Sequence, residues 1–440
     1  MRNELVLWWS IAGIITLQLP CPAQQLTWLG RLPNGGVSEA VAVSDNGIVV
    51  VGRAENVNYQ WRAFRWTAAA GMVPLGTFGG SFSEALGVAP DGSTVVGRAH
   101  DSVGRWRAFR WDAAAGMHDL GTLGGRESEA TAVAPSGTVV GRAMNPSLQA
   151  RAFRWSRHSG MQDLGTFGGT ESAAWGIARD SLVIVGWAEN ADRQARAFRW
   201  TSVTGLQDLG TLGGARSEAY GVSADGSVVV GRAENDDRLW RAFRWTAATG
   251  MQELGTLGGR ESAALALSAD GSVVVGWATT QTGDWRAFRW TAATGLQDLN
   301  IVYSRAVGRS LLYVARGISA DGRYIVGHGI NATTGRQEAY LLDTQGGSDA
   351  EEPLPQPLAL SVEPQPVVGR MGSASYRLPS ALWVSLSVVD LLGRAVATLA
   401  DGWHSAGVHR VALPPLPAGT YMLLLRTEHG TLSRPFVVLR

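Results

Sequence analysis

The stretch from Ser217 to Gly259 reads SEAYGVSADGSVVVGRAENDDRLWRAFRWTAATGMQELGTLGG, and close copies of it fill most of the chain. The tryptophan that ends each copy of the RAFRW segment recurs at Trp66, Trp111, Trp155, Trp200, Trp245 and Trp290. Its period is about 45 residues, which is typical of the blades of a β-propeller.

Each copy contains four short segments of β character separated by turn signals. In the quoted copy we expect strands at residues 218–223, 227–233, 241–246 and 251–257. Asp225 and Gly226 predict a tight turn between the first two strands, because both positions of a two-residue hairpin favour residues that tolerate a positive φ. The pattern therefore indicates one four-stranded antiparallel sheet for each copy.

The number of copies decides the architecture. The valine-rich second strand ends in a glycine seven times, at Gly52, Gly97, Gly141, Gly186, Gly231, Gly276 and Gly327. This predicts an all-β protein with a seven-bladed β-propeller in residues 24–344. Residues 26–32 look like a lone fourth strand and the last repeat has only three, so we expect the N-terminal strand to close the last blade. A β-solenoid or an open array of hairpins is the alternative, but it would leave its end sheets uncovered.

Composition narrows the class of protein. The chain has 440 residues, is 45% hydrophobic and carries a formal charge of +1. Every basic residue is an arginine. A near-neutral chain without a basic run does not fit an electrostatic nucleic-acid binder, so we expect no nucleic-acid partner.

The N-terminus has the pattern of a secretory signal. A short charged start precedes an apolar run at residues 5–19, which is too short to cross a bilayer comfortably. We expect residues 1–23 to be removed by cleavage between Ala23 and Gln24, leaving no transmembrane span in the mature chain. The alternative is a lipoprotein acylated on Cys21, the only cysteine. If cleavage follows Ala23, this cysteine leaves with the signal and no disulfide can form.

The composition changes after the repeats. Residues 345–358 are rich in glycine, acidic residues and proline, and we interpret them as a linker. In residues 359–440 we expect strands at 374–378, 383–391, 408–413, 420–426 and 432–439, with a hairpin turn at His429 and Gly430. This pattern predicts a small immunoglobulin-like β-sandwich.

Two family resemblances follow from these motifs. The repeat resembles the HAF family of bacterial extracellular repeats, on Ala197 to Trp200, Asp208 to Gly214 and Ser223 to Gly231. The order of its segments also resembles that of WD-repeat propellers, which implies that the first strand lines the channel. Neither resemblance implies an activity.

The C-terminal domain resembles the sorting domain of type IX secretion cargo. The motif residues are Asp390, Gly393, Arg394, Gly419, Tyr421 and the terminal Arg440. The resemblance implies export across the outer membrane of a Bacteroidota-like bacterium, with residues 359–440 contacting the export machinery. It also implies a secreted protein, located extracellularly or on the outer-membrane surface.

The loop between the second and third strands varies most among the copies. Loops placed on a rigid scaffold are where binding residues concentrate. The candidate binding residues in these loops are His100, Asp101, Glu189, Asp192, Glu234, Asp236, Asp237, Arg238 and Asp284. The opposing interpretation is that these loops vary because nothing constrains them.

A second group of candidates opens the first strand near the expected channel mouth: Glu39, Glu84, Glu129 and Glu218. Together with the serines before them, these carboxylates could hold a hard cation such as calcium. The better-supported expectation is that the serine and glutamate side chains satisfy buried groups. Arg232 and its counterparts become Trp187 and Trp277 in two copies, which indicates stacking on a neighbouring aromatic ring.

We identify no catalytic residues and expect no cofactor. The histidines lack metal-ligand spacing, and the sequence contains no nucleophile or phosphate-loop motif. Our first hypothesis is a binding or interaction scaffold for a polysaccharide or a surface protein. The second is a lyase or glycosidase, which would need two carboxylates at a defined separation. The third is a structural surface-layer component.

Overall fold

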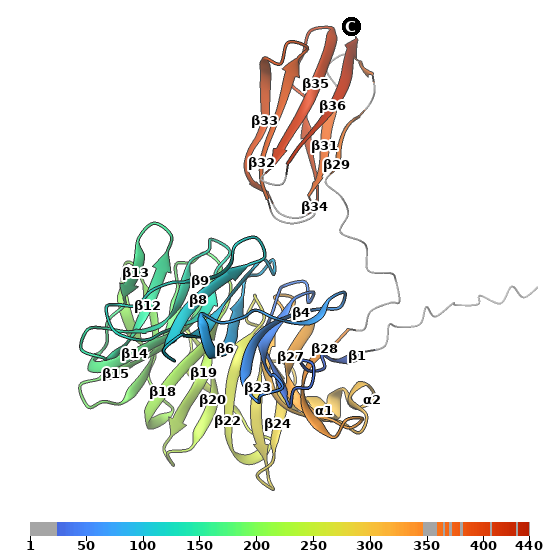
Figure 1. Ribbon diagram of the computed structural model, residues 1–440. Coiled ribbons are helices and arrows are strands. Elements are labelled where there is room, and N and C mark those ends of the chain that lie inside the picture. The colour runs from blue at the N-terminus through green and yellow to red at the C-terminus, as the bar shows by residue number, and fades with distance from the viewer. Residues whose placement is uncertain are drawn as a thin grey trace, which may run out of the picture. The chain divides into compact units, whose positions relative to one another are not determined.

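The computed structural model describes residues 24–345, 359–363, 366–368, 372–378, 382–404, 407–427 and 430–439. The chain divides into two compact units, Met1–Ser348 and Asp349–Arg440. The first unit is a seven-bladed β-propeller, in which seven four-stranded antiparallel sheets follow one another around a ring (Figure 1).

Six blades are formed by four consecutive strands. They are β2 (Ser38–Val43), β3 (Val50–Glu55), β4 (Trp61–Thr67), β5 (Gly71–Pro74); β6 (Gly79–Val88), β7 (Thr94–Asp101), β8 (Trp106–Asp112), β9 (Gly116–Asp119); β10 (Ser128–Val133), β11 (Val139–Met144), β12 (Ala150–Ser156), β13 (Gly160–Asp163); β14 (Gly168–Ile177), β15 (Ile184–Asn190), β16 (Ala195–Thr201), β17 (Gly205–Asp208); β18 (Gly213–Val222), β19 (Val228–Asn235), β20 (Trp240–Thr246), β21 (Gly250–Gly255); and β22 (Gly258–Leu267), β23 (Val273–Thr280), β24 (Trp285–Thr291), β25 (Gly295–Asp298).

The seventh blade joins the two ends of the repeat region. It contains β26 (Leu311–Ile318), β27 (Tyr324–Asn331), β28 (Arg336–Asp343) and the N-terminal β1 (Gln25–Trp28), which pairs antiparallel with β28. Figure 1 shows the blue β1 beside the orange β28. Two short helices, α1 (Leu299–Val302) and α2 (Ser304–Val307), precede this blade. The ring is thus closed by backbone hydrogen bonds within one sheet.

The second unit is a β-sandwich. Its sheets have the orders β29-β31-β34 and β30-β36-β35-β32-β33, and both contribute to one hydrophobic core. The strands are β29 (Ala359–Glu363), β30 (Val367–Val368), β31 (Ser373–Leu378), β32 (Leu382–Asp390), β33 (Ala395–His404), β34 (Gly407–Ala412), β35 (Gly419–Thr427) and β36 (Gly430–Leu439). The sequence pattern missed β29, β30 and β33. Half of the expected His429–Gly430 turn lies outside the described residues.

A serine in the first strand links each of blades 1 to 6 to the blade before it. The Ser217 hydroxyl accepts a hydrogen bond from Ala197 N in the preceding blade at 2.9 Å and donates one to Gly210 O at 2.6 Å. Ser38 makes the same two bonds across the ring closure, to Ala339 N and Gly30 O. The expectation that these serines satisfy buried groups is therefore confirmed.

Replacing Ser217 by alanine is expected to lower the free energy of unfolding by about 1 to 3 kcal/mol, because the buried Ala197 N–H loses its acceptor. Urea unfolding of the full chain measures the effect. Ser202 is exposed in a turn, so Ser202→Ala is the matched control and should change stability by less than about 0.5 kcal/mol. Equal effects of the two changes would contradict the bridging role.

Candidate binding site in the central channel

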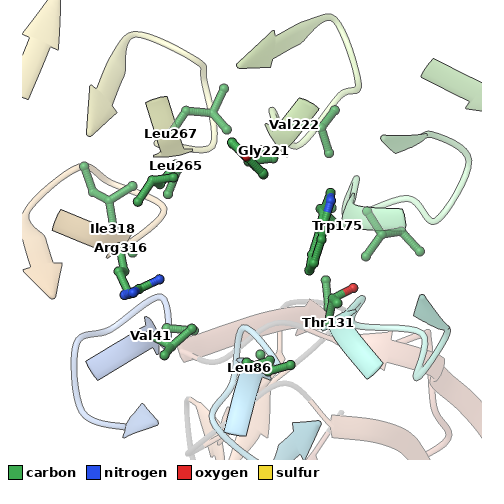
Figure 2. A pocket seen from close by; sticks show the side chains of 18 of the residues that line it. Val41, Leu86, Thr131, Trp175, Gly221, Val222, Leu265, Leu267, Arg316 and Ile318 are labelled. Atoms are coloured by element: carbon green, nitrogen blue, oxygen red, sulfur yellow. The ribbon is translucent and has the colours of Figure 1, made fainter. Parts of the chain in front are cut away.

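The first strands of the blades surround a cavity of about 740 Å³ at the centre of the ring. Each contributes one side chain to the middle of the channel: Val41, Leu86, Thr131, Trp175, Tyr220, Leu265 and Arg316. The next layer is entirely aliphatic: Val43, Val88, Val133, Ile177, Val222, Leu267 and Ile318. The expected position of the first strand is confirmed by this lining. Around the open centre, Figure 2 shows Val41, Leu86, Thr131, Trp175, Leu265 and Arg316.

One end of the channel carries the Asp-Gly turns and is bridged. Asp45 of the first blade forms an ion pair with Arg179 of the fourth, three blades along and so across the channel. Backbone hydrogen bonds also link successive turns, for example Ala224 N to Ala269 O at 2.8 Å. The cavity extends away from this turn end, to Glu218 and Arg232 at the other end of the first and second strands. We call that other end the loop end.

Glutamates and arginines alternate around part of the loop end. Arg53 donates to Glu39 Oε2 at 2.8 Å within its own blade and to Glu84 Oε1 at 2.9 Å in the next. Arg98 repeats this arrangement between Glu84 and Glu129, at 2.9 and 2.8 Å. Arg142 then pairs with Glu129, and Arg232 pairs with Glu218. We call these side chains the ion-pair belt.

The belt arginines also lie on aromatic rings. The guanidinium carbons of Arg53, Arg98 and Arg232 are 4.5, 4.2 and 4.3 Å from the ring centroids of Trp61, Trp106 and Trp240. Where tryptophan replaces the arginine, Trp277 stacks on Trp285 at 4.0 Å between centroids. The stacking expected from the exchange of arginine and tryptophan is confirmed.

The channel-mouth glutamates are therefore placed by the structure in ion pairs. A cluster of guanidinium groups repels calcium electrostatically, so the belt does not fit the cation site considered from the sequence. Among the residues that the structure describes, no three histidine, cysteine, aspartate or glutamate side chains gather as a metal site.

Several loop candidates stabilise their own loops. Asp101 accepts hydrogen bonds from the backbone N–H groups of Val103 and Arg105, which lowers its pKa. Glu189 accepts from Thr170 and Glu171, and it too has a lowered pKa. The ring of His100 lies 4.1 Å from that of Trp106.

The buried Glu234 accepts from Arg216 Nε at 2.8 Å. Asp192, Asp236, Asp237, Arg238 and Asp284 lie exposed on the same loops. These five belong to three different blades, so the loop candidates do not converge on one site.

The sorting-motif residues that are described form local structure. Asp390 accepts from the backbone of Leu392 and Arg394 and pairs with the Arg394 side chain, while Gly393 adopts a φ of +79° in this turn. The Tyr421 hydroxyl donates to Pro417 O at 3.0 Å. Ala23 and Arg440 lie outside the described residues.

Two channel residues that the sequence analysis missed have unsatisfied donors. Arg316 Nε and Trp175 Nε1 are buried and have no hydrogen-bond partner in the protein. The two side chains lie on opposite sides of the channel (Figure 2). The end of the Arg316 guanidinium group points into the open space, whereas Nε and the indole nitrogen are covered by protein. The available signal was a departure from the repeat: six of the seven mid-channel positions are uncharged, and position 316 is arginine.

These features define a β-propeller with an arginine and a tryptophan on opposite sides of its channel. No family model and no curated protein matches the chain. Among solved structures, the fold is similar to the β-propeller domain of the Trilobed protease from Pyrococcus furiosus, with a TM-score of 0.48, 11% identity and coverage of 72% of this chain and 99% of that one.

It is also similar to TolB from Acinetobacter baumannii, with a TM-score of 0.41, 14% identity and coverage of 65% of this chain and 77% of that one. For Kuenenia stuttgartiensis hydrazine synthase the values are 0.41, 10%, 76% and 98%. No function is transferred from such distant likenesses. Within the described part of the chain, no helix has the length and apolar character needed to span a membrane.

Proposed function

We propose that this protein is a secreted binding module that takes its ligand into the central channel of the propeller. The observation that carries this proposal is the guanidinium group of Arg316, which points into a cavity of about 740 Å³ with Trp175 on its opposite side. A guanidinium group at this position can give a ligand charge-assisted hydrogen bonds, which are stronger than those between neutral groups. The cavity volume lies in the range of small-molecule sites, roughly 300 to 1,000 Å³.

Binding fits the channel better than hydrolysis. A glycosidase requires one carboxyl group held protonated by a raised pKa. Glu39 has a lowered pKa, because nearby His328, Arg53 and Arg316 outweigh the effect of its burial. Glu84, Glu129 and Glu218 are each ion-paired to arginine. These carboxylates therefore serve to hold the blades and the guanidinium groups in place.

The proposed location of the protein follows from the sequence patterns at the two ends of the chain. Residues 1–23 have the pattern of a secretory signal. Residues 359–440 resemble a type IX sorting domain, and this resemblance implies a Bacteroidota-like host. We propose that the export machinery binds the sandwich and that the propeller meets its ligand outside the cell. Pulse-labelling in such a host, followed by cell fractionation, compares the location of the full chain with that of a chain lacking residues 359–440. We expect the truncated chain to stay in the periplasm. Equal export of both chains would contradict the proposed role of the sandwich.

A variant with a filled channel tests the site. Leu265→Trp adds a large side chain to the mid-channel layer, and Val203→Trp makes a similar addition at a fully exposed turn position. In a thermal-shift screen of the full chain against neutral and acidic sugars, we expect a ligand that raises the melting temperature of the wild type and Val203→Trp but not of Leu265→Trp. Ligand at about 100 times its Kd stabilises by about 2.7 kcal/mol, which is readily measured. A shift that survives in a folded Leu265→Trp variant would place binding outside the channel.

A further inference from the structure

We propose that the ligand of the central channel carries a carboxylate group on a six-membered ring, as a uronic acid does, and that Arg316 binds this carboxylate. The assignment rests on the proposed function and specifies the chemical class of its ligand. Three features lead to it: the charges around the channel, the surroundings of the Arg316 side chain, and the groups opposite to it.

The charges of the channel do not balance. Around the loop end, Glu39, Glu84 and Glu129 alternate with Arg53, Arg98 and Arg142, and Glu218 pairs with Arg232. Four carboxylates thus match four guanidinium groups. Arg316 is the fifth arginine, so the channel contains one positive charge in excess.

Glu39 is the only carboxylate near Arg316 among the described ion pairs, and its oxygens are already bonded. Its Oε2 accepts two hydrogen bonds from Arg53, and its Oε1 accepts one from Gln337 Nε2 at 3.0 Å. Arg316 Nη2 lies 3.8 Å from Glu39 Oε2, which is too far for a hydrogen bond. Burial lowers the pKa of Arg316. An anion that reached this guanidinium group would gain a charge-assisted, fork-shaped interaction without breaking an existing one.

The opposite side of the channel offers a surface for a ring. Trp175 lies across the channel from Arg316, between Thr131 and Gly221 (Figure 2). Its ring is 6.3 Å from that of Tyr220, in an edge-to-face arrangement. Leucine side chains at positions 86 and 265 complete the layer. Aromatic and aliphatic groups favour the apolar face of a ring.

Together, the two sides specify one ligand class. The guanidinium group of Arg316 offers only donors to the channel, so the ligand must supply acceptor oxygens on that side. An inorganic anion could bind Arg316 but leaves the aromatic side uncovered. A neutral ring could cover Trp175 but leaves the guanidinium group unpaired. A ring with a carboxylate satisfies both sides.

Isothermal titration of the full chain tests the ligand class with four probes: galacturonate, benzoate, galactose and sulfate. Galacturonate and benzoate represent two sources of the same chemistry, a sugar acid and an aromatic acid, and whichever binds more tightly identifies the source. We expect galactose and sulfate to bind at least about 10-fold more weakly, because each lacks one half of the ligand.

Variants of Arg316 test the residue. Arg316→Gln should weaken the better carboxylate probe by about 10- to 100-fold, and Arg316→Lys by less, since it keeps the charge but loses the fork. Arg157→Gln removes the same charge from an exposed turn between β12 and β13, away from the candidate loops, and should leave affinity unchanged. The melting temperature of Arg316→Gln without ligand should stay close to that of the wild type, because the change removes only the long ion pair with Glu39, at 3.8 Å.

The outcomes separate this inference from the proposed function. Equal affinities for galactose and galacturonate, both abolished by Leu265→Trp, would overturn the carboxylate assignment and leave channel binding intact. An unchanged affinity in Arg316→Gln would also overturn it. Binding of any probe that survives in Leu265→Trp would overturn both.

Discussion

Replacing Gly231 by alanine is expected to destabilise the propeller by about 3 kcal/mol or more. Gly231 lies in β19 opposite Ala219, beside a β-bulge in β18 between Ala219 and Gly221. The bulge brings the Glu218 carbonyl oxygen so close to Gly231 that an added Cβ would overlap with it. The added Cβ would also lie too close to the ring of the fully buried Phe243, so it could not shift away from the oxygen without a second clash. Chemical denaturation of the full chain measures the loss.

Gly250→Ala is the matched control for Gly231→Ala. Gly250 has a φ of +65°, but nothing lies within 4 Å of an added Cβ, so only backbone strain of about 1 kcal/mol is expected. A loss at Gly231 no larger than that at Gly250 would contradict the close approach of the strands. The same bulge recurs in the first strand of all seven blades, so Gly97→Ala should repeat the result.

Lowering the pH from 7 to 4 is expected to remove about 3 kcal/mol of stability through His328 alone. This side chain is 8% exposed, and burial lowers its pKa to about 4. Glu39 raises the pKa, whereas Arg316 and Arg53 lower it. Because the folded pKa lies below the unfolded value of about 6.5, the unfolded chain binds the proton first. The contribution is therefore complete above pH 6.5 and is lost as the pH falls toward 4.

The variant His328→Gln isolates this effect. The difference in unfolding free energy between wild type and His328→Gln should depend on pH between 6.5 and 4 and level off on both sides. His158→Gln, at an exposed position, should show no such dependence. A constant difference for His328→Gln across this range would show that His328 keeps an ordinary pKa.

The fold was readable from the sequence because its signals are local and repeated. Asp225 and Gly226 define a turn by their own backbone preferences, and the alternation in RAFRW places Phe243 in the core without reference to distant residues. The recurring glycine at position 231 helped to identify the repeat, but the sequence did not show why a glycine is required there. The bulge that requires glycine lies in a neighbouring strand, and only the pairing register reveals it.

The site was harder to predict. Acidic residues in variable loops suggested ligand contacts, yet Asp101 and Glu189 bond backbone N–H groups nearby, as acidic side chains beside turns often do. The partners of Glu84 come from two blades, so the belt depends on the ring being closed. Arg316 stands out only when the seven first strands are aligned with each other. Strand β33 was missed because none of its residues is fully buried, which leaves no clear alternation.

A crystal structure of the full chain with the tighter of galacturonate and benzoate tests the central claim most directly. We expect the ligand inside the propeller channel, with its carboxylate on the guanidinium group of Arg316 and its ring beside Trp175. Ligand bound instead at the exposed loops that carry Asp192, Asp236 and Asp237, with none in the channel, would contradict the account.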